Sequence, residues 1–342
     1  MAIKASGSKL AFSEITNEFG DNDTSSLGGY RIRSGGATYP HTFPGGLSFS
    51  SLDTGIPTSG QIKFSDFYGK KLNMVVDFYS GGTELRSGTP ISALTRYNSN
   101  SVTIIGGYTS KPSNTGGKKV YIHVNKTLGS DQNINHRNVA LTTGLFNFAT
   151  ELFVHVGLNG KILGSGGKGG RGRRDANGDN GVDGSSALGL LTAATIINKG
   201  RIQAGFGGGG GGAGNGQNVK TGKKSSRYET ASGGGGGSGA GLPVGEKGTS
   251  EQGSTSNGSD GNPGQEQNGG AGGGGGTNSG TGGTGGGGNS NDANAPNGGN
   301  SSKFVGGTGG RNGYAIISTG GSSPTITGNA VVGRILTSAT PV

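Results

Sequence analysis

The sequence predicts a mainly β protein with a small N-terminal module, a β-sandwich or short β-solenoid in the middle, and a C-terminal bundle of packed polyglycine-II helices. Glycine accounts for 81 of the 342 residues and hydrophobic residues for only 28%, against about 7% glycine and about 45–50% apolar residues in ordinary globular domains. Of the glycines, 58 lie between Gly160 and Gly321, whereas 17 of the 21 Phe and Tyr residues precede Gly160. Ordinary hydrophobic cores are therefore expected only in the first half.

The N-terminal module, residues 1–70, contains a short internal repeat. Leu10-Ala-Phe-Ser-Glu-Ile15 returns as Ile62-Lys-Phe-Ser-Asp-Phe67. In each copy a serine directly precedes an acidic residue, which is typical of a helix N-cap with an acid in the first turn. Residues 27–60 are rich in Gly, Ser, Thr and Pro and predict a loop. We expect two short helical turns that hold this loop between them; two unrelated capped turns would give the same pattern.

Residues 71–158 form the predicted β-rich domain. Short runs rich in β-branched and aromatic residues are separated by Gly, Asn and Ser clusters, where turns form easily. These runs are Leu72–Tyr79, Val102–Ile105, Lys119–Val124 and Glu151–Val156. They fit an antiparallel sandwich and a solenoid equally well. Two later segments, Val156–Gly164 and Ile196–Gly205, each read as strand, Asn/Gly turn and strand, and predict β-hairpins that lead into glycine tracts.

Residues 159–321 form the predicted polyglycine-II domain, followed by a C-terminal β segment at 322–342. Uninterrupted runs such as Gly207–Gly212 occur beside doublets with a three-residue repeat, as in Gly166–Gly172. Collagen is excluded because the chain has only 10 prolines, and a flexible Gly/Ser linker is the alternative. A polyglycine-II helix has three residues per turn and no internal hydrogen bonds, so its backbone groups must bond sideways. Packed helices of this kind explain both patterns.

Two parts of the chain resemble proteins of tailed bacteriophages. Phe12-Ser-Glu-Ile-Thr-Asn-Glu-Phe-Gly20 followed by Ile56-Pro-Thr-Ser-Gly-Gln-Ile-Lys-Phe-Ser-Asp-Phe-Tyr-Gly69 resembles a module found near the N-termini of phage virion proteins. Residues 160–188, 195–205 and 306–317, with the polyglycine between them, look like the glycine-rich adhesin domains of phage tail fibres. The resemblance implies a structural protein of the virion, made in the host cytoplasm, that acts as a tail-fibre or receptor-binding adhesin.

The same resemblance implies the partners of the protein. The N-terminal module would bind other virion tail proteins, and the glycine-rich domain would contact a host receptor, either an anionic glycan or an outer-membrane protein. A homo-oligomer or a larger assembly is expected. The alternatives are a non-adhesive phage structural protein of the baseplate, neck or capsid decoration, and a glycine-rich extracellular matrix protein.

Enzymatic activity and cofactors are not expected. The sequence has no HExxH motif, no Gly-x-Ser-x-Gly elbow between strand and helix, and no acid/base pair of carboxylates. His123 and His155 alternate with apolar neighbours and are expected in the walls or on the surface of strands. Membrane insertion is not expected because no run approaches about 18 apolar residues. The net charge of +10 is spread along the chain and Arg-Gly-Gly repeats are absent, which argues against a dedicated nucleic-acid site.

Receptor contacts are predicted in the long connections between glycine runs, where side chains are not constrained by close packing. One connection combines the densest basic patch with an aromatic ring, and its candidate contact residues are Lys220, Lys223, Lys224, Arg227 and Tyr228. The cationic groups suit the phosphates and carboxylates of anionic glycans, and the tyrosine offers a stacking face. Solvated loop charges with no ligand are the alternative.

A calcium site is a further candidate. Carboxylate and amide oxygens recur along one short segment, at Asp175, Asn177, Asp179 and Asp183, and such oxygens are the ligands that calcium prefers. Ser186 stands where a bidentate glutamate would complete the loop. A simple Asx/Gly turn is the alternative interpretation.

Overall fold

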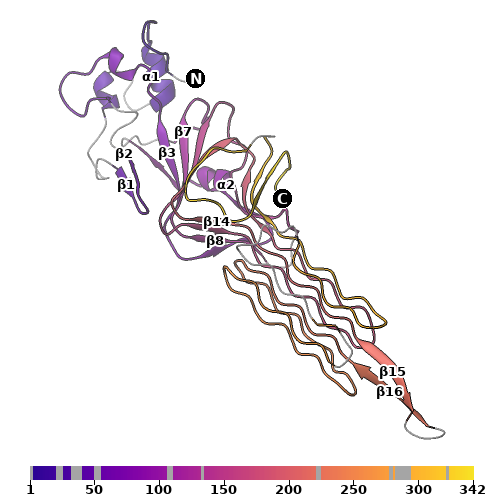
Figure 1. Cartoon of the computed structure of the whole chain (residues 1–342). Helices are drawn as coiled ribbons and strands as arrows, with labels where there is room; N and C mark the ends of the chain where they lie inside the picture. The colour runs from indigo at the N-terminus through magenta and orange to yellow at the C-terminus, as the bar shows by residue number, and fades with distance from the viewer. Residues whose placement is uncertain are drawn as a thin grey trace.

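The structure, a computed structural model of the chain, describes residues 3–20, 26–31, 41–49, 55–105, 111–131, 135–220, 225–276, 280–281, 294–320 and 323–342. The molecule is elongated, with the N-terminal module at one end, a stack of strands in the middle and glycine-rich segments extending to the opposite end (Figure 1). The described residues contain 19 strands and two α-helices. Neither helix has the length and apolar composition needed to cross a bilayer.

The N-terminal module combines short helices with one hairpin. Its elements are α1 (Phe12–Phe19), the 3-10 turn η1 (Leu27–Tyr30), β1 (His41–Phe43), β2 (Leu47–Phe49) and the 3-10 turn η2 (Phe64–Phe67). Both copies of the repeat therefore form a helical turn, as predicted. The acidic residues cap these turns: Glu14 accepts the Ala11 N–H at 2.8 Å, and Asp66 accepts the Lys63 N–H at 2.7 Å. Each N-cap thus lies two residues before the predicted serine.

A buried ion pair joins the module to the middle of the molecule. The Lys118 ammonium lies 3.1 Å from the Glu18 carboxylate, and the two side chains are 3% and 0% exposed. The other Glu18 oxygen accepts the Leu72 N–H at 2.8 Å. Burial raises the pKa of Glu18 despite the nearby ammonium. Because each charge is buried against the other, loss of either one would leave an uncompensated charge in the interior.

A buried histidine pair holds the β1–β2 hairpin. His123 and His155 lie with their Nδ1 atoms 2.9 Å apart, and His123 Nε2 lies 2.7 Å from the Pro44 carbonyl oxygen between β1 and β2. A carbonyl only accepts, so His123 Nε2 carries a hydrogen and His155 Nδ1 donates to His123 Nδ1. Burial lowers the pKa of both rings, that of His155 to about 4. Both histidines are buried, so of the two expected positions, in the walls or on the surface of strands, the structure shows the first.

The middle of the molecule is a stack of coils whose strands form three sheets. Strands of successive coils pair in parallel, which is the arrangement of a short β-solenoid. The first sheet contains β3 (Asn73–Phe78), β7 (Lys119–Val124), β10 (Glu151–Val156), β13 (Ala194–Asn198) and β18 (Ile326–Gly328), with β6 (Val102–Ile104) antiparallel at one edge. The second contains β4 (Glu84–Leu85), β8 (Thr127–Gly129), β11 (Lys161–Leu163) and β14 (Arg201–Gln203). The third contains β5 (Ile91–Ser92), β9 (Val139–Thr142), β12 (Ser186–Leu190), β17 (Tyr314–Ser318) and β19 (Arg334–Thr337). The helix α2 (Ala93–Asn98) directly follows β5.

Alternation along the strands separates the core from the outer face. In β10, Leu152, Val154 and Val156 are at most 3% exposed and belong to the hydrophobic core. Phe153, between them, is on the opposite face, as the two-residue period of a strand requires. Its ring stacks on that of Tyr121, with ring centroids 4.6 Å apart.

The two predicted β-hairpins are wrong. β10 and β11 belong to different sheets, as do β13 and β14, so the chain turns a corner of the solenoid and does not fold back on itself. The predicted Asn/Gly turns occupy these corners, at Asn159-Gly160 and at Asn198-Lys199-Gly200. A Cβ on Gly160 would lie 2.2 Å from the Val124 carbonyl oxygen of the preceding coil. Glycine is required there because successive coils approach closely.

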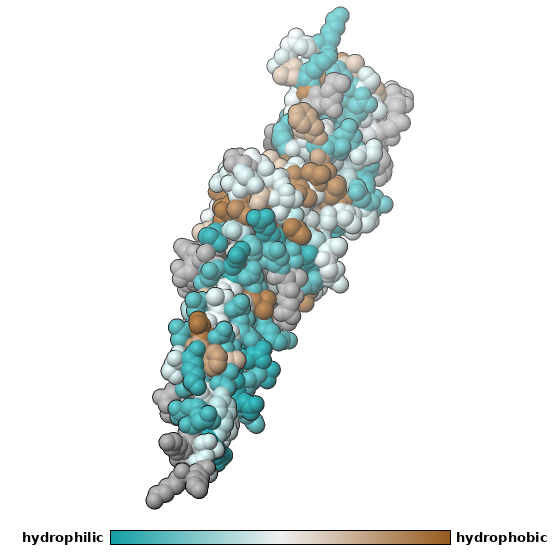
Figure 2. Space-filling model, turned by 90° about the vertical axis from the view of Figure 1, so that its right-hand side faces the viewer, coloured by the Kyte–Doolittle hydropathy of each residue, from teal (hydrophilic) through white to brown (hydrophobic). Residues whose placement is uncertain are grey.

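The glycine-rich region consists of two excursions from the solenoid. The chain leaves between β11 and β12, at residues 164–185, and again between β14 and β17, at residues 204–313. Both excursions therefore start at the end of the second sheet and return to the third. Figure 2 shows mostly hydrophilic residues over this region, whereas hydrophobic residues gather nearer the middle of the molecule.

Backbone hydrogen bonds link the glycine segments sideways. Gly167 N–H donates to the Phe206 carbonyl and Gly170 N–H to the Gly209 carbonyl, both at 2.8 Å, so the contacts recur at every third residue. A Cβ on Gly170 would lie 2.1 Å from the Asp179 carbonyl oxygen. Segments with side chains at such positions could not approach closely enough to bond.

The predicted fold class is wrong for the C-terminal part of the chain. A bundle of polyglycine-II helices was expected over residues 159–321, but this region contains β-strands, among them the hairpin of β15 (Asn215–Lys220) and β16 (Ser226–Ala231) and then β17. β18 and β19 lie in the predicted C-terminal β segment. The described glycine segments between these strands are assigned to no helix. The prediction failed because strands after the glycine runs extend sheets begun in the first half of the chain. A local glycine pattern carries no information about such distant pairing.

Candidate functional site

The β15–β16 hairpin forms the end of the molecule opposite the N-terminal module (Figure 1). We call this end, with the segments at the base of the hairpin, the distal end. The two strands pair antiparallel along their whole length. Arg227 and Tyr228 on β16 are exposed, whereas Thr230 is buried where the hairpin joins the glycine segments. The distal end thus has exposed side chains on the hairpin and buried residues where the hairpin joins the glycine segments.

Tyr228 packs across Gly216 of the neighbouring strand. Its hydroxyl donates to the Asp175 carboxylate, and a Cβ on Gly216 would lie 2.3 Å from that hydroxyl oxygen. Glycine at this position is therefore what allows the tyrosine to reach Asp175. The Lys303 ammonium donates to the Gly216 carbonyl from a third segment. Tyr228 is still 49% exposed, so part of its ring is available to a ligand.

A hollow of about 350 Å³ opens beside the tyrosine. It is lined by Arg174, Asp175, Tyr228, Thr230 and Ser254. Thr230 N–H donates to Ser254 Oγ at 2.7 Å and Ser254 N–H donates to Thr230 Oγ1 at 2.9 Å, which fixes the two walls to each other. Arg174 is exposed, and its guanidinium forms no ion pair with any residue that the structure describes. The hollow therefore combines an unpaired cation, an aromatic ring and hydroxyl groups with the Asp175 carboxylate, which accepts the Tyr228 hydroxyl.

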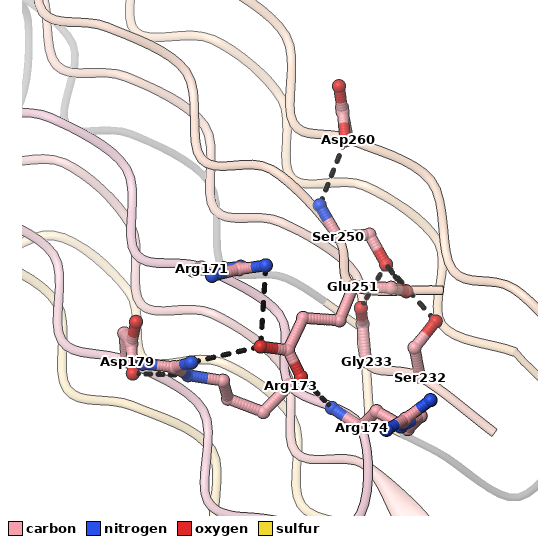
Figure 3. Close-up of polar contacts among 9 residues, drawn as sticks. All are labelled: Arg171, Arg173, Arg174, Asp179, Ser232, Gly233, Ser250, Glu251 and Asp260. Carbon is pink, nitrogen blue, oxygen red and sulfur yellow. Dashed lines mark hydrogen bonds and ion pairs between the residues drawn. The ribbon is translucent and has the colours of Figure 1, made fainter. Parts of the chain in front are cut away.

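Glu251 forms ion pairs with two further arginines near the hollow, Arg171 and Arg173 (Figure 3). Its carboxylate lies 2.9 Å from Arg173 and 3.4 Å from Arg171, and it accepts the Arg174 N–H at 2.8 Å. Partial burial acts to raise the pKa of Glu251, but the Arg174 N–H and the two guanidinium groups lower it overall. Arg173 also donates to Asp179 at 2.8 Å. Among the described residues that line the hollow, Arg174 is left as a cation without an ion pair.

Three of the five predicted receptor-contact residues lie on the described strands of the hairpin. Arg227 and Tyr228 are exposed on β16, and Lys220 ends β15. Lys223 and Lys224 lie outside the described residues. Of the five, the structure places Tyr228 in the hollow.

Sequence reasoning did not place Arg174 and Ser254 beside Tyr228. They come from segments far apart in the sequence and meet only because the glycine segments end together at the base of the hairpin. A signal was present, since each lies shortly after a stretch with glycine at every third residue, Gly166–Gly172 and Gly245–Gly248. Where such a repeat stops, the neighbouring segments again leave room for side chains.

The four calcium candidates are not brought together. Among the residues described, no group of three or more His, Cys, Asp or Glu side chains is placed to hold a metal ion. The oxygens bond to the protein: Asp175 accepts from Tyr228, and Asp179 from Arg173. The remaining oxygens join a ladder in which side chains at every third residue accept backbone N–H groups. Its bonds are Asn177 with Val305 at 2.9 Å, Asn180 with Thr308 at 2.8 Å and Asp183 with Arg311 at 2.6 Å.

Comparison with known proteins gives one match. No family model matches the chain, and no curated protein matches its sequence. Among solved structures, the chain is similar to the crystal structure of the gp37-gp38 adhesin tip complex of the bacteriophage S16 long tail fiber. The match covers 98% of this chain and 100% of that chain, with 18% identity and a TM-score of 0.40. A TM-score this low does not establish a shared fold.

Proposed function

We propose that the protein is a non-enzymatic, tail-fibre-like adhesin of a tailed-phage virion, which binds an anionic host glycan at its distal end. The observation that carries the proposal is the hollow beside Tyr228. An unpaired guanidinium suits a phosphate or carboxylate, to which it can donate two parallel hydrogen bonds. The tyrosine ring and the hydroxyls of Thr230 and Ser254 suit the apolar face and the hydroxyl groups of a sugar.

The placement of the two ends supports the proposal. The N-terminal module, which resembles a module of phage virion proteins, lies at one end of an elongated molecule, and the distal end lies at the other. A protein that bridges a virion and a cell needs its two contact surfaces far apart. The buried pair of Glu18 and Lys118 gives the module a firm connection to the solenoid. We propose that other tail proteins of the virion bind this module.

The test is adsorption of the labelled, purified protein to the bacterial cells on which virions carrying it are grown. The double variant Arg174→Ala, Tyr228→Ala should bind at least about tenfold more weakly, since it loses a charge-assisted hydrogen bond and a stacking face. Arg311→Ala is the matched control, because Arg311 is exposed and lies near the start of β17, away from the hairpin. Unchanged adsorption of the double variant, with melting temperatures equal to the parent's, would contradict the proposed site.

Two further measurements test the class of protein. Mass spectrometry of purified virions should detect the chain, and its absence from particles would contradict the phage assignment. Release of reducing ends from host glycan by the purified protein would contradict the proposal that it is not an enzyme.

A further inference from the structure

A second hollow lies on the solenoid, distant in sequence from the β15–β16 hairpin. It has a volume of about 500 Å³ and spans three successive coils, at the corner where the third sheet ends and the first sheet begins. The residues that matter for its chemistry are Thr150, Glu151, Phe153, Thr195, Ser318 and Thr325. Its size falls in the range of small-ligand sites, about 300–1,000 Å³.

One wall of this hollow is an aromatic ring with one face covered. The Phe153 ring stacks on Tyr121, with an angle of 12° between the planes. On the other side the sheet register places Thr195 next to Phe153, and Thr325 precedes β18 one strand further on. Across the sheet, two aromatic side chains are thus followed by two smaller threonine side chains. A flat apolar group can lie over the threonines against the uncovered face of the phenylalanine.

The polar lining consists mainly of hydroxyl groups. The hydroxyls of Thr195 and Thr325 have no hydrogen-bond partner among the residues that the structure describes. Ser318 adds a third hydroxyl from the third sheet. Each can donate one hydrogen bond and accept two. Such groups complement a ligand that also both donates and accepts through hydroxyl groups.

The charge of the lining disfavours anionic ligands. Glu151 is the charged residue of the lining, and one of its oxygens is bound by the Lys71 ammonium. The second oxygen can accept from a ligand hydroxyl. No cation is among the described lining residues, and Lys71 is already bound to Glu151, so a phosphate or carboxylate would gain no ion pair here.

We propose that this hollow binds a neutral saccharide, with the apolar face of one sugar ring against Phe153 and its hydroxyl groups bonded to Thr195, Thr325 and Glu151. The site differs in chemistry from the cationic distal end and does not depend on the function proposed for it. An adhesin with both would hold a charged and an uncharged part of a host glycan.

Saturation-transfer-difference NMR on the full-length protein tests the site. Glucose, galactose, mannose and N-acetylglucosamine are offered singly at up to about 50 mM, because a single sugar ring in such a site is expected to bind in the millimolar range. At least one should receive saturation, with its ring C–H protons enhanced most because they face Phe153. No transfer to any of the four would overturn the proposal.

Variants separate binding from folding. Phe153→Ala should weaken the binding about tenfold through loss of the apolar contact, and Thr195→Val, which keeps the shape, about two- to tenfold through loss of one hydrogen bond. Phe148→Ala is the matched control, because Phe148 is 96% exposed in the segment before β10 and outside this hollow. Signals unchanged in both site variants would overturn the assignment. The double variant at Arg174 and Tyr228 should keep this binding, so failure of either site is recognisable separately.

Discussion

The close packing of the glycine segments predicts a severe effect for a single added methyl group at Gly211. A Cβ there would lie 2.1 Å from the Arg171 carbonyl oxygen, about 1.2 Å short of an ordinary C···O contact. Gly211 N–H donates to the Asp179 carbonyl and its own carbonyl accepts the Gly307 N–H, both at 2.8 Å. A shift of about 1.2 Å stretches both bonds beyond hydrogen-bonding range. Gly211→Ala therefore disturbs three neighbouring segments at once.

The magnitude of the effect is estimated from these contacts. Overpacking costs about 1–3 kcal/mol, and two lost hydrogen bonds add about 0.5–1.5 kcal/mol each. Alanine also lowers the conformational entropy of the unfolded chain, which stabilises the folded protein by about 0.4–1 kcal/mol. The net loss is about 3 kcal/mol. With an unfolding entropy of about 2.1 cal/mol/K per residue, the melting temperature of the whole chain should fall by about 4 °C.

Gly274→Ala is the matched control for this prediction. Gly274 is exposed, its backbone avoids the left-handed region, and an added Cβ would lie 3.7 Å from Ser259 Oγ, an ordinary contact. Its melting temperature should equal or slightly exceed the parent's. The assays are scanning calorimetry and digestion by a nonspecific protease. If Gly211→Ala melts within about 1 °C of the control and resists protease equally, the inferred close packing is wrong.

Two buried groups outside the glycine region give further predictions. Lys118→Ala leaves Glu18 buried without its partner and should lower the free energy of unfolding by about 3–5 kcal/mol, measured by urea denaturation; a loss below about 1 kcal/mol would show that the pair does not anchor the module. His155 has a pKa of about 4 when folded but about 6.5 when unfolded, so the unfolded chain binds more protons between these values and stability falls as the pH drops. Denaturation curves from pH 7 to pH 4 should show a loss of about 3 kcal/mol from this group, and His155→Asn, which keeps a neutral donor, should lose less. Equal losses in parent and variant would contradict the assignment.

Local patterns in the sequence predicted the elements that depend on near neighbours. The repeat around Phe12 and Phe64 predicted two helical turns, because a cap and its acid lie within one turn of each other. Runs rich in β-branched and aromatic residues predicted β7 and β10 with their full bounds, since such side chains favour the extended backbone of a strand. Tyr228 could be proposed as a contact residue because an aromatic residue beside basic ones is visible in the sequence itself.

Tertiary structure decided everything that depends on which segments meet. The Asn/Gly pair before Lys161 fits a hairpin and a solenoid corner equally well, and the parallel partner strands select the corner. Glycine runs indicate that neighbours approach closely but not which neighbours, so the return of the chain to the third sheet as β17 was not foreseen. Arg174 and Ser254 join Tyr228 only where separate segments end together.

Composition by itself determined that half of this chain must be held by its backbone, because it has few apolar side chains to bury. The arrangement of that backbone could be learned only from the tertiary structure, because hydrogen bonds between distant segments leave no local pattern in the sequence.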